Sequence, residues 1–350
     1  MRFFFPLLLL VTFISEVLLL LSVSTIILLQ HHYRKMKTLF DIPFRTEHAR
    51  KDIPPITENA ASGHTVFAMA SDTNRSAAEN QDACCARGNA ESHIRIVTIA
   101  DGIGSSLHAK EGSCFVARTA VDLVAAALDI NPEVPDFLPI FSDIQSRLRD
   151  MVANSYAGEL STLPDDSFGT TLLVGIDFPD EFVAAYVGNG AIYHLSGFFA
   201  EFPKSICLPW NSVNVLNPHS IPHDGQETLY KFFCYNARSY QYSPSVIRIK
   251  KDMKTPGDIF LLATDGIDSA DQCKPVIDKQ KNIYVPTSRP MDEFYAYLKL
   301  FLQGKMPVTD VTLQDMLQQF LHNMKEAGML GDDSTLGVFI SAKAQEYFQR

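Results

Sequence analysis

The sequence predicts an α+β domain in which β-sheets pack as a sandwich and pairs of helices cover them. The first observation is the order of the elements: strand-like runs come first, two helical patterns follow, and strands, helices and one last strand complete the chain. Helices grouped between runs of strands favour this class over a regular alternation of strand and helix. The second observation is composition, because 46% hydrophobic and 20% charged residues are typical of a globular domain with a buried core.

The first element is an apolar run over residues 3–29 that holds a single charge, Glu16. As a helix this run is roughly 40 Å long, enough to cross a bilayer with some tilt. A cleaved signal peptide is the alternative, but the run is too long for one and no small-x-small cleavage site follows it. Only Arg2 precedes the run, whereas Arg34, Lys35 and Lys37 follow it. This bias predicts that the body of the protein faces the cytoplasm.

Residues 1–37 are therefore predicted to be a transmembrane anchor with a basic flank. Residues 38–62 contain three prolines and no clear periodicity, which indicates a linker. The folded domain is predicted over residues 63–345. The six cysteines of the chain are scattered and form no Cys-x-x-Cys pair, which fits reduced, mostly buried thiols better than a zinc site.

The domain begins with β-rich runs that predict strands over residues 64–70, 83–86 and 94–100. Apolar residues then recur at helical spacing over residues 113–128 and 140–156, which predicts two helices. Prolines between these two patterns separate one helix from the next.

The second half of the domain returns to strands and ends on a strand after two helices. Gly188-Asn189-Gly190 indicates a hairpin turn between two of the strands. Strands are predicted over residues 170–176, 182–187, 191–195, 246–249, 259–263 and 334–340, and amphipathic helices over residues 291–302 and 311–325.

The charge balance excludes one class of partner. The chain has 30 Lys and Arg against 40 Asp and Glu, a formal net charge of −10. Recognition of a phosphate backbone needs a surplus of basic residues, so no nucleic acid is expected as a partner. The acidic surplus is either an ordinary solvated surface or, in part, a cluster that holds hard cations such as Mg²⁺ or Mn²⁺.

Four aspartates stand where a predicted strand meets a turn: Asp82, Asp101, Asp265 and Asp332. One such Asp is most often only a turn residue, since Asp bonds its own backbone and a neighbouring Gly supplies a positive φ. Four of them at strand ends of one sandwich can converge, and carboxylates at close range repel one another unless cations compensate. The set therefore predicts a site for divalent cations at the ends of the strands.

Five segments contain or accompany these aspartates: Asp101-Gly102-Ile103-Gly104-Ser105, Phe168-Gly169-Thr170-Thr171-Leu172, Val187-Gly188-Asn189-Gly190-Ala191, Ala263-Thr264-Asp265-Gly266-Ile267 and Gly331-Asp332-Asp333-Ser334-Thr335-Leu336. In order and rough spacing this set resembles the metal-dependent protein serine/threonine phosphatases, the type 2C or PPM family, over about residues 65–340. Gln81-Asp82-Ala83 is similar to the bacterial branch that begins with Gln-Asp-Ala. The resemblance implies a four-layer α/β/β/α sandwich with two Mn²⁺ or Mg²⁺ ions at one end.

The resemblance also implies a role for each aspartate. Asp101 becomes the carboxylate that bridges both metal ions, and the Gly102 carbonyl binds one of them. Asp82 becomes a metal ligand and, with Asp101, a catalytic residue, while Asp265 and Asp332 hold the other ion. The implied reaction is hydrolysis of phosphoserine or phosphothreonine in cytoplasmic proteins by a water whose pKa the paired cations lower.

The sequence departs from the family pattern at three functional positions. Gln81 is neutral where the family has the first acid of a Glu-Asp pair, and Asn189 replaces the Asp of a third, weaker metal site, so a third ion is not expected. Ala77 stands at the arginine that grips the substrate phosphate. Arg75, two residues earlier and on the same side of an extended segment, is the candidate substitute, and an exposed arginine on a strand edge is the alternative.

Two functions therefore compete. The first is a membrane-anchored, metal-dependent phosphatase. The second is a degenerate, non-catalytic domain that binds phosphoproteins or partners. Retention of all four aspartates favours the enzyme, because a pure scaffold does not need a carboxylate cluster whose repulsion destabilises it.

Overall fold

The computed structural model describes residues 65–74, 79–89, 91–196, 211–223, 226–251, 258–269, 276–278, 283–285, 290–304 and 306–349. Internal contacts divide the chain into two units, residues 1–49 and 50–350, and every described residue belongs to the second. The predicted anchor and linker over residues 1–62 lie outside the described residues and stay predictions. In the described part of the chain, no helix is both long enough and apolar enough to span a bilayer.

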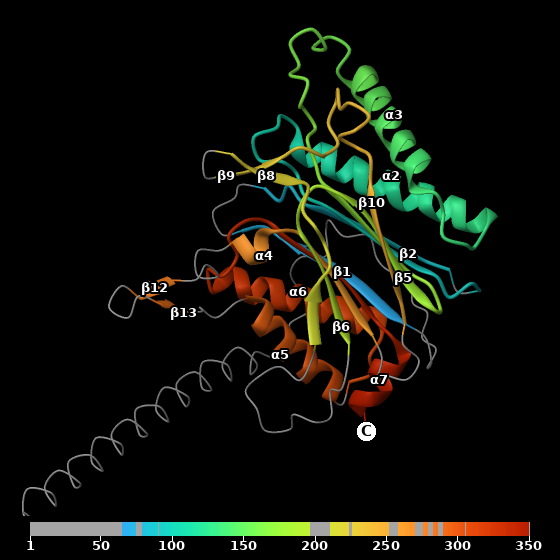
Figure 1. Cartoon of the computed structure of the whole chain (residues 1–350), viewed down its shortest axis with the longest axis vertical. Coiled ribbons are helices and arrows are strands. Elements are labelled where there is room, and N and C mark those ends of the chain that lie inside the picture. Colours follow the sequence, from blue (N-terminus) through green and yellow to red (C-terminus); the bar gives the residue numbers. More distant parts are fainter. Residues whose placement is uncertain are drawn as a thin grey trace, which may run out of the picture. The chain divides into compact units, whose positions relative to one another are not determined.

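Two five-stranded antiparallel sheets form the centre of the domain (Figure 1). The first sheet has the order β1-β14-β11-β6-β7, with bounds Val66–Asp72, Ser334–Ile340, Ile259–Ala263, Ala191–Ser196 and Asn211–Asn214. The second has the order β10-β5-β4-β3-β2, with bounds Ser245–Lys250, Glu181–Val187, Leu172–Asp177, Arg95–Ala100 and Ala83–Gly88. Two small hairpins accompany them, β8–β9 (Ser220–His223 and Gln226–Leu229) and β12–β13 (Val276–Asp278 and Ile283–Val285).

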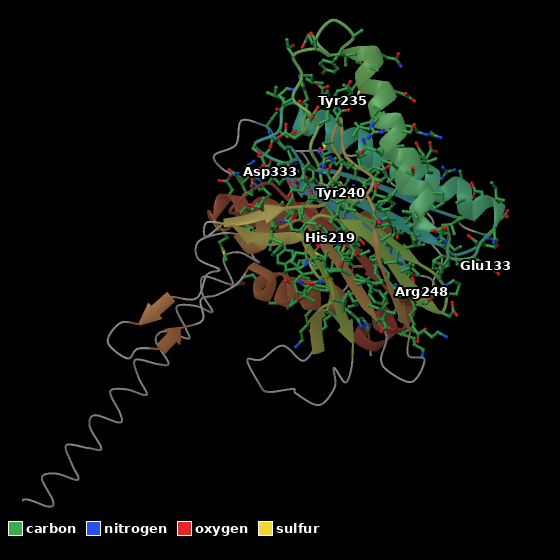
Figure 2. All side chains as sticks on the ribbon, turned by 45° about the horizontal axis from the view of Figure 1, so that its top comes forward. Glu133, His219, Tyr235, Tyr240, Arg248 and Asp333 are labelled. Carbon is green, nitrogen blue, oxygen red and sulfur yellow. The ribbon has the colours of Figure 1, made fainter. Side chains whose placement is uncertain are left out.

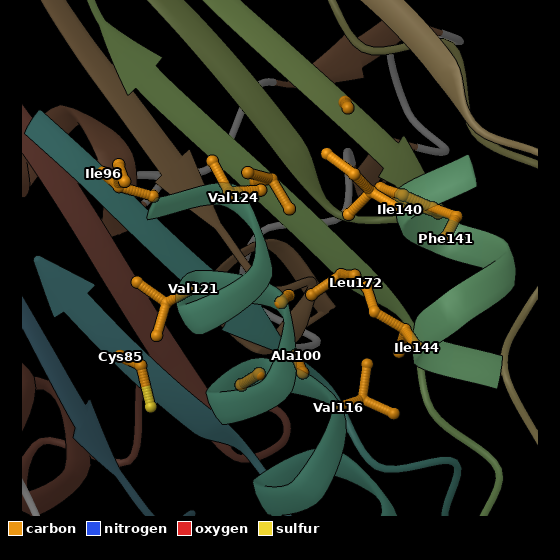
Figure 3. Packing of buried hydrophobic residues seen from close by; sticks show 14 of the residues in the cluster. Cys85, Ile96, Ala100, Val116, Val121, Val124, Ile140, Phe141, Ile144 and Leu172 are labelled. Carbon is orange, nitrogen blue, oxygen red and sulfur yellow. The ribbon is translucent and has the colours of Figure 1, made fainter. Parts of the chain in front are cut away.

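Helices cover the outer face of each sheet (Figure 1). The second sheet packs against α2 (Ala109–Ile130) and α3 (Phe137–Ser155) through the cluster of aliphatic and aromatic side chains drawn in Figure 3. The first sheet packs against α5 (Pro290–Gln303) and α6 (Asp310–Glu326), with α7 (Ala342–Gln349) at the end of the chain. A third cluster, rich in phenylalanine, fills the space between the two sheets. The predicted four-layer α/β/β/α sandwich is confirmed.

The helices and strands predicted over residues 64–340 all occur, with ends shifted by a few residues at most, whereas the apolar run over residues 3–29 lies outside the described residues. The strands over residues 334–340 and 259–263 lie where they were predicted. The prediction of a hairpin at Gly188-Asn189-Gly190 is wrong, because β5 belongs to the second sheet and β6 to the first, so this turn crosses from one sheet to the other. The analysis of the sequence missed β7, β8, β9, β12, β13, α7 and the one-turn helix α4 (Gly266–Ser269). The missed strands have only three or four residues each, too few for a period of two to be recognised.

The strand register brings five chain segments to one end of the sandwich. In the first sheet, Asp72 pairs with Ser334 and Ala263 pairs with Leu336, so β1 and β11 end where β14 begins. In the second sheet, Ala83 pairs with Ala100, so β2 begins where β3 ends. Asp82 directly precedes β2 and Asp101 directly follows β3, whereas one residue separates Asp265 from the end of β11 and Asp332 from the start of β14.

Candidate metal centre

Asp82 and Asp101 lie at the centre of this end of the sandwich. The Thr264 hydroxyl donates a hydrogen bond to Asp82 Oδ2 at 2.8 Å, and Asp82 is only 6% exposed. The other carboxylate oxygen, Asp82 Oδ1, is buried and receives no hydrogen bond from a donor in the described residues. Each of the carboxyls of Asp82 and Asp101 affects the pKa of the other, which places the two side chains close together. A buried carboxylate oxygen without a donor is a costly feature unless a cation binds it.

The backbone of Asp101 is fixed by two threonines that precede β4. The Asp101 N–H donates to the Thr171 hydroxyl at 3.0 Å, and the Thr170 hydroxyl donates to the Asp101 carbonyl at 2.9 Å. Thr170 also forms a β-bridge with Gly102. These contacts extend the second sheet by one residue beyond β3, which holds the Asp101 carboxyl at the sheet end.

Gly102 lies where the backbone of three segments meets. A Cβ at this position would stand 2.8 Å from the Gln81 carbonyl oxygen and 3.1 Å from the carbonyl of Ala109, the first residue of α2. The Ser113 hydroxyl in the same helix donates to the Gln81 carbonyl at 2.5 Å. Only glycine fits this close approach, which brings the N-terminal turn of α2 against the site.

Asp265 and Asp332 each receive a hydrogen bond from a side-chain amide. Asn189 Nδ2 in the β5–β6 turn donates to Asp265 Oδ2 at 2.8 Å. Asn74 Nδ2 after β1 donates to Asp332 Oδ1 at 3.4 Å. From the sequence, Asn189 was interpreted as a turn residue that replaces an Asp of the family. The structure shows that each of the two asparagines is a donor to a predicted metal ligand.

Asp333 organises the loops around the site, and the sequence analysis gave it no role. Its Oδ1 accepts from the Asn74 N–H at 3.0 Å and its Oδ2 accepts from the Gln81 N–H at 2.7 Å, with the residue 6% exposed (Figure 2). Burial raises the pKa of Asp333, and the positive charge of Lys110 opposes that rise. A second Asp directly before a buried strand was the sequence signal for this buried acceptor. Thr264, the residue before Asp265, was missed in the same way.

The charges of the other three predicted aspartates act on Asp101. Desolvation raises the pKa of Asp101 well above its usual value, and the charges of Asp82, Asp265 and Asp332 raise it further. Burial is also the main reason why the pKa of Asp82 is raised, although hydrogen bonds from Thr264 and Thr335 oppose it. Repulsion of this kind is what a bound divalent cation relieves.

The donor set fits Mn²⁺ or Mg²⁺. Both are hard cations that prefer carboxylate and carbonyl oxygens, which Asp82, Asp101, Gly102, Asp265 and Asp332 supply. The buried oxygen Asp82 Oδ1 supports this fit. Among the described residues, no three His, Cys, Asp or Glu side chains already stand in an arrangement that would hold an ion. The roles of individual ligands therefore stay predictions.

The candidate phosphate clamp, Arg75, lies outside the described residues, as does Ala77. The described residues on the N-terminal side of this segment bind α6: Lys325 Nζ contacts Asp72 Oδ1 at 3.0 Å and the Thr73 hydroxyl at 2.6 Å. Asp72 is thus tied to a helix, and the site does not include it.

The comparisons with known proteins agree with this geometry. A family model described as Protein phosphatase 2C matches residues 72–322, well over half of the chain. The chain belongs to the protein phosphatase 2C family. The match bears out the predicted class of enzyme, a protein serine/threonine phosphatase. No match was found among curated proteins.

Solved structures share the phosphatase 2C fold at low sequence identity. A bacterial serine phosphatase is 16% identical, with 79% of this chain and 98% of that chain covered and a TM-score of 0.52. PppA, described as a key regulatory component of T6SS in Pseudomonas aeruginosa, is 16% identical, with 80% and 99% covered and a TM-score of 0.50. A C. elegans sex determining protein is 11% identical, with 84% and 69% covered and a TM-score of 0.55.

Proposed function

We propose that this phosphatase 2C domain is an active, metal-dependent hydrolase of phosphoserine and phosphothreonine in cytoplasmic proteins, anchored to a membrane by residues 3–29. The observation that carries the catalytic part is the convergence of Asp82, Asp101, Asp265 and Asp332 at one end of the sandwich, with a buried carboxylate oxygen that has no donor among the described residues. Repulsion between the carboxylates of such a cluster destabilises the folded protein, and binding of cations explains why the cluster is present.

In this proposal Asp82, Asp101, Asp265, Asp332 and the Gly102 carbonyl would hold two cations, and Asp101 would be the ligand that the two ions share. Bound Mn²⁺ or Mg²⁺ supplies a metal-activated water at neutral pH and offsets negative charge on the phosphoryl group. The chain itself orients the ligands. Thr264 selects one oxygen of Asp82, and the amide of Asn189 selects one oxygen of Asp265.

The alternative is a non-catalytic module that binds phosphoproteins or partners. The neutral side chains of Gln81 and Asn189 favour it, because each removes a negative charge from the site. The Asn189 amide nevertheless donates to Asp265 and the Gln81 backbone N–H donates to Asp333, so the alternative accounts for fewer of the observations than the enzyme does.

Phosphate release by the purified full chain, kept in detergent, is the direct test. We expect release from p-nitrophenyl phosphate and from a phosphothreonine peptide with Mn²⁺ or Mg²⁺, and none above background with EDTA. Calorimetry of Mn²⁺ binding on the same preparation separates the two functions. Metal binding without phosphate release would support the binding module, and release in EDTA would contradict metal dependence.

The membrane anchor needs its own experiment. The prediction of an anchor rests on the apolar run over residues 3–29 and on the basic residues that follow it. A reporter that is active only in an oxidising compartment, fused after Arg350, is expected to stay inactive in cells while the protein fractionates with membranes. An active reporter would overturn the cytoplasmic orientation, and recovery of the protein in the soluble fraction would overturn the anchor.

A further inference from the structure

His219 lies outside the carboxylate cluster, yet it is 4% exposed and every polar atom of the residue is bonded (Figure 2). It stands directly before β8 and directly after Pro218. Its N–H donates to the Gly188 carbonyl at 2.9 Å, and its carbonyl accepts from the Tyr230 N–H at 3.0 Å. Its backbone thus connects the β5–β6 turn to the end of β9.

The ring of His219 makes two further bonds. The Gly188 N–H donates to Nδ1 at 3.2 Å, and Nε2 lies 2.8 Å from the Ser245 hydroxyl at the start of β10. A backbone N–H can only donate, so Nδ1 must be an acceptor and the ring proton is on Nε2. Burial lowers the pKa of His219 to about 4, and the charge of Lys231 acts in the same direction. The ring is therefore neutral at neutral pH.

The β5–β6 turn, which the His219 ring contacts, has a backbone with high conformational freedom. Gly188 and Gly190 have φ of 102° and 105°, in the region that glycine adopts readily. Two glycines around one asparagine leave the turn with little conformational restriction of its own. The two hydrogen bonds between Gly188 and His219, one to the backbone and one to the ring, supply that restriction.

An aromatic residue holds the His219 ring from the same strand that leads into the turn. Tyr186 stacks on the ring with centroids 4.9 Å apart and an interplanar angle of 19°. Its hydroxyl donates to the Asn217 carbonyl at 3.0 Å and accepts from the Asn217 N–H at 3.2 Å. Segment 217–219 is thus clamped against β5 at both of its ends.

One residue of the β5–β6 turn connects it to the predicted metal centre. Asn189, between the two glycines, donates its amide to Asp265 Oδ2 at 2.8 Å. We propose that His219 is a positioning residue of the metal centre, whose ring fixes the β5–β6 turn so that Asn189 orients Asp265. This inference rests on the proposed function, because it assigns to Asp265 the ligand role given there.

The variant His219→Phe keeps a ring for Tyr186 to stack on but removes the acceptor for the Gly188 N–H. We expect it to weaken Mn²⁺ binding, measured by calorimetry on the full chain in detergent, by roughly tenfold, as loss of an outer-shell partner does. His219→Asn, which places an acceptor oxygen close to the position of Nδ1, is expected to restore most of the affinity.

His194→Phe is the matched control. His194 in β6 is also largely buried and hydrogen-bonded, at 2.7 Å to Asp258, and it stacks on Phe260 at 4.7 Å. These contacts of His194 do not involve the β5–β6 turn, so its loss should lower thermal stability and leave Mn²⁺ affinity unchanged. Equal Mn²⁺ affinity in His219→Phe and the wild type would overturn the inference, whatever the thermal stability of the variant.

A double-mutant cycle tests the same connection without metal. The unfolding constants of His219→Phe, Asn189→Ala and the double variant are measured by urea titration in EDTA. If His219 acts through the turn, the unfolding constant of the double variant rises over that of the wild type by less than the product of the two single-variant increases. Independent effects would contradict the inference even if the wild type binds no Mn²⁺. Absence of phosphate release, in contrast, would contradict only the proposed enzyme.

Discussion

Asp101→Ala is expected to reduce metal-dependent phosphate release by on the order of 10³-fold or more, since a metal site supplies several kcal/mol of transition-state stabilisation. In the proposed centre Asp101 is the only residue that binds both cations. Its loss therefore affects both halves of the site, whereas loss of Asp265 or Asp332 affects one. Initial rates at saturating Mn²⁺ measure the effect.

A second readout of the same variant does not depend on turnover. The charges of Asp82, Asp265 and Asp332 destabilise the ionised form of Asp101 when no cation is bound. In EDTA, Asp101→Ala should therefore unfold at a temperature equal to or above that of the wild type. With Mn²⁺, the wild type should gain thermal stability and the variant should gain little.

Asp310→Asn serves as the control for loss of a buried carboxylate. Asp310 begins α6 and accepts a hydrogen bond from the Phe67 N–H at 3.0 Å, which an asparagine oxygen still accepts. Burial raises the pKa of Asp310 as well, but β1 separates it from the carboxylate cluster. We expect turnover close to wild type. Near-wild-type turnover of Asp101→Ala would instead show that the bridging assignment is wrong.

Lys251→Met is expected to cost about 3–5 kcal/mol of the free energy of unfolding, because it leaves a buried carboxylate without its cation. Lys251 Nζ lies 2.7 Å from Asp177, and the two side chains are 8% and 3% exposed. Lys251 also donates to the Phe178 carbonyl. Burial raises the pKa of Asp177 even though Lys251 opposes the rise. Urea unfolding at pH 7 measures the loss.

Because the pKa of Asp177 is raised, the stability loss of Lys251→Met should depend on pH. A carboxyl whose pKa is higher in the folded than in the unfolded protein destabilises the fold once pH exceeds its folded pKa. The deficit of Lys251→Met should therefore shrink as pH is lowered toward the ordinary range of an aspartate. Asp177→Leu combined with Lys251→Met removes both charges and should recover most of the loss.

An exposed ion pair provides the comparison. Arg147 and Asp143 on α3 are 3.1 Å apart, and both side chains are about half exposed. Arg147→Met should change the free energy of unfolding by no more than about 0.5 kcal/mol, since solvent already screens this pair. A similar loss for Lys251→Met and Arg147→Met would contradict the account of the buried pair.

The sequence by itself determined the order of the elements and the identity of the four aspartates. Apolar periodicity over residues 113–128 and 140–156 is a local signal, and it placed α2 and α3 because an amphipathic helix requires that pattern wherever it packs. The strand ends at Asp101 and Asp265 were also recognisable, since each is an apolar run followed by Asp-Gly. Family-like segments in the right order then connected these ends to one site.

Only the tertiary structure decided which side chains orient those aspartates. Asn189 and Asp265 are 76 residues apart, and Asp333 lies 252 residues from Gln81, so no local pattern links either pair. His219 stands between Pro218 and Pro222 in the sequence, yet its ring is buried because Tyr186 and the β5–β6 turn enclose it. Hydrogen bonds between distant segments depend on strand register and loop packing, which a single sequence does not encode in any local spacing.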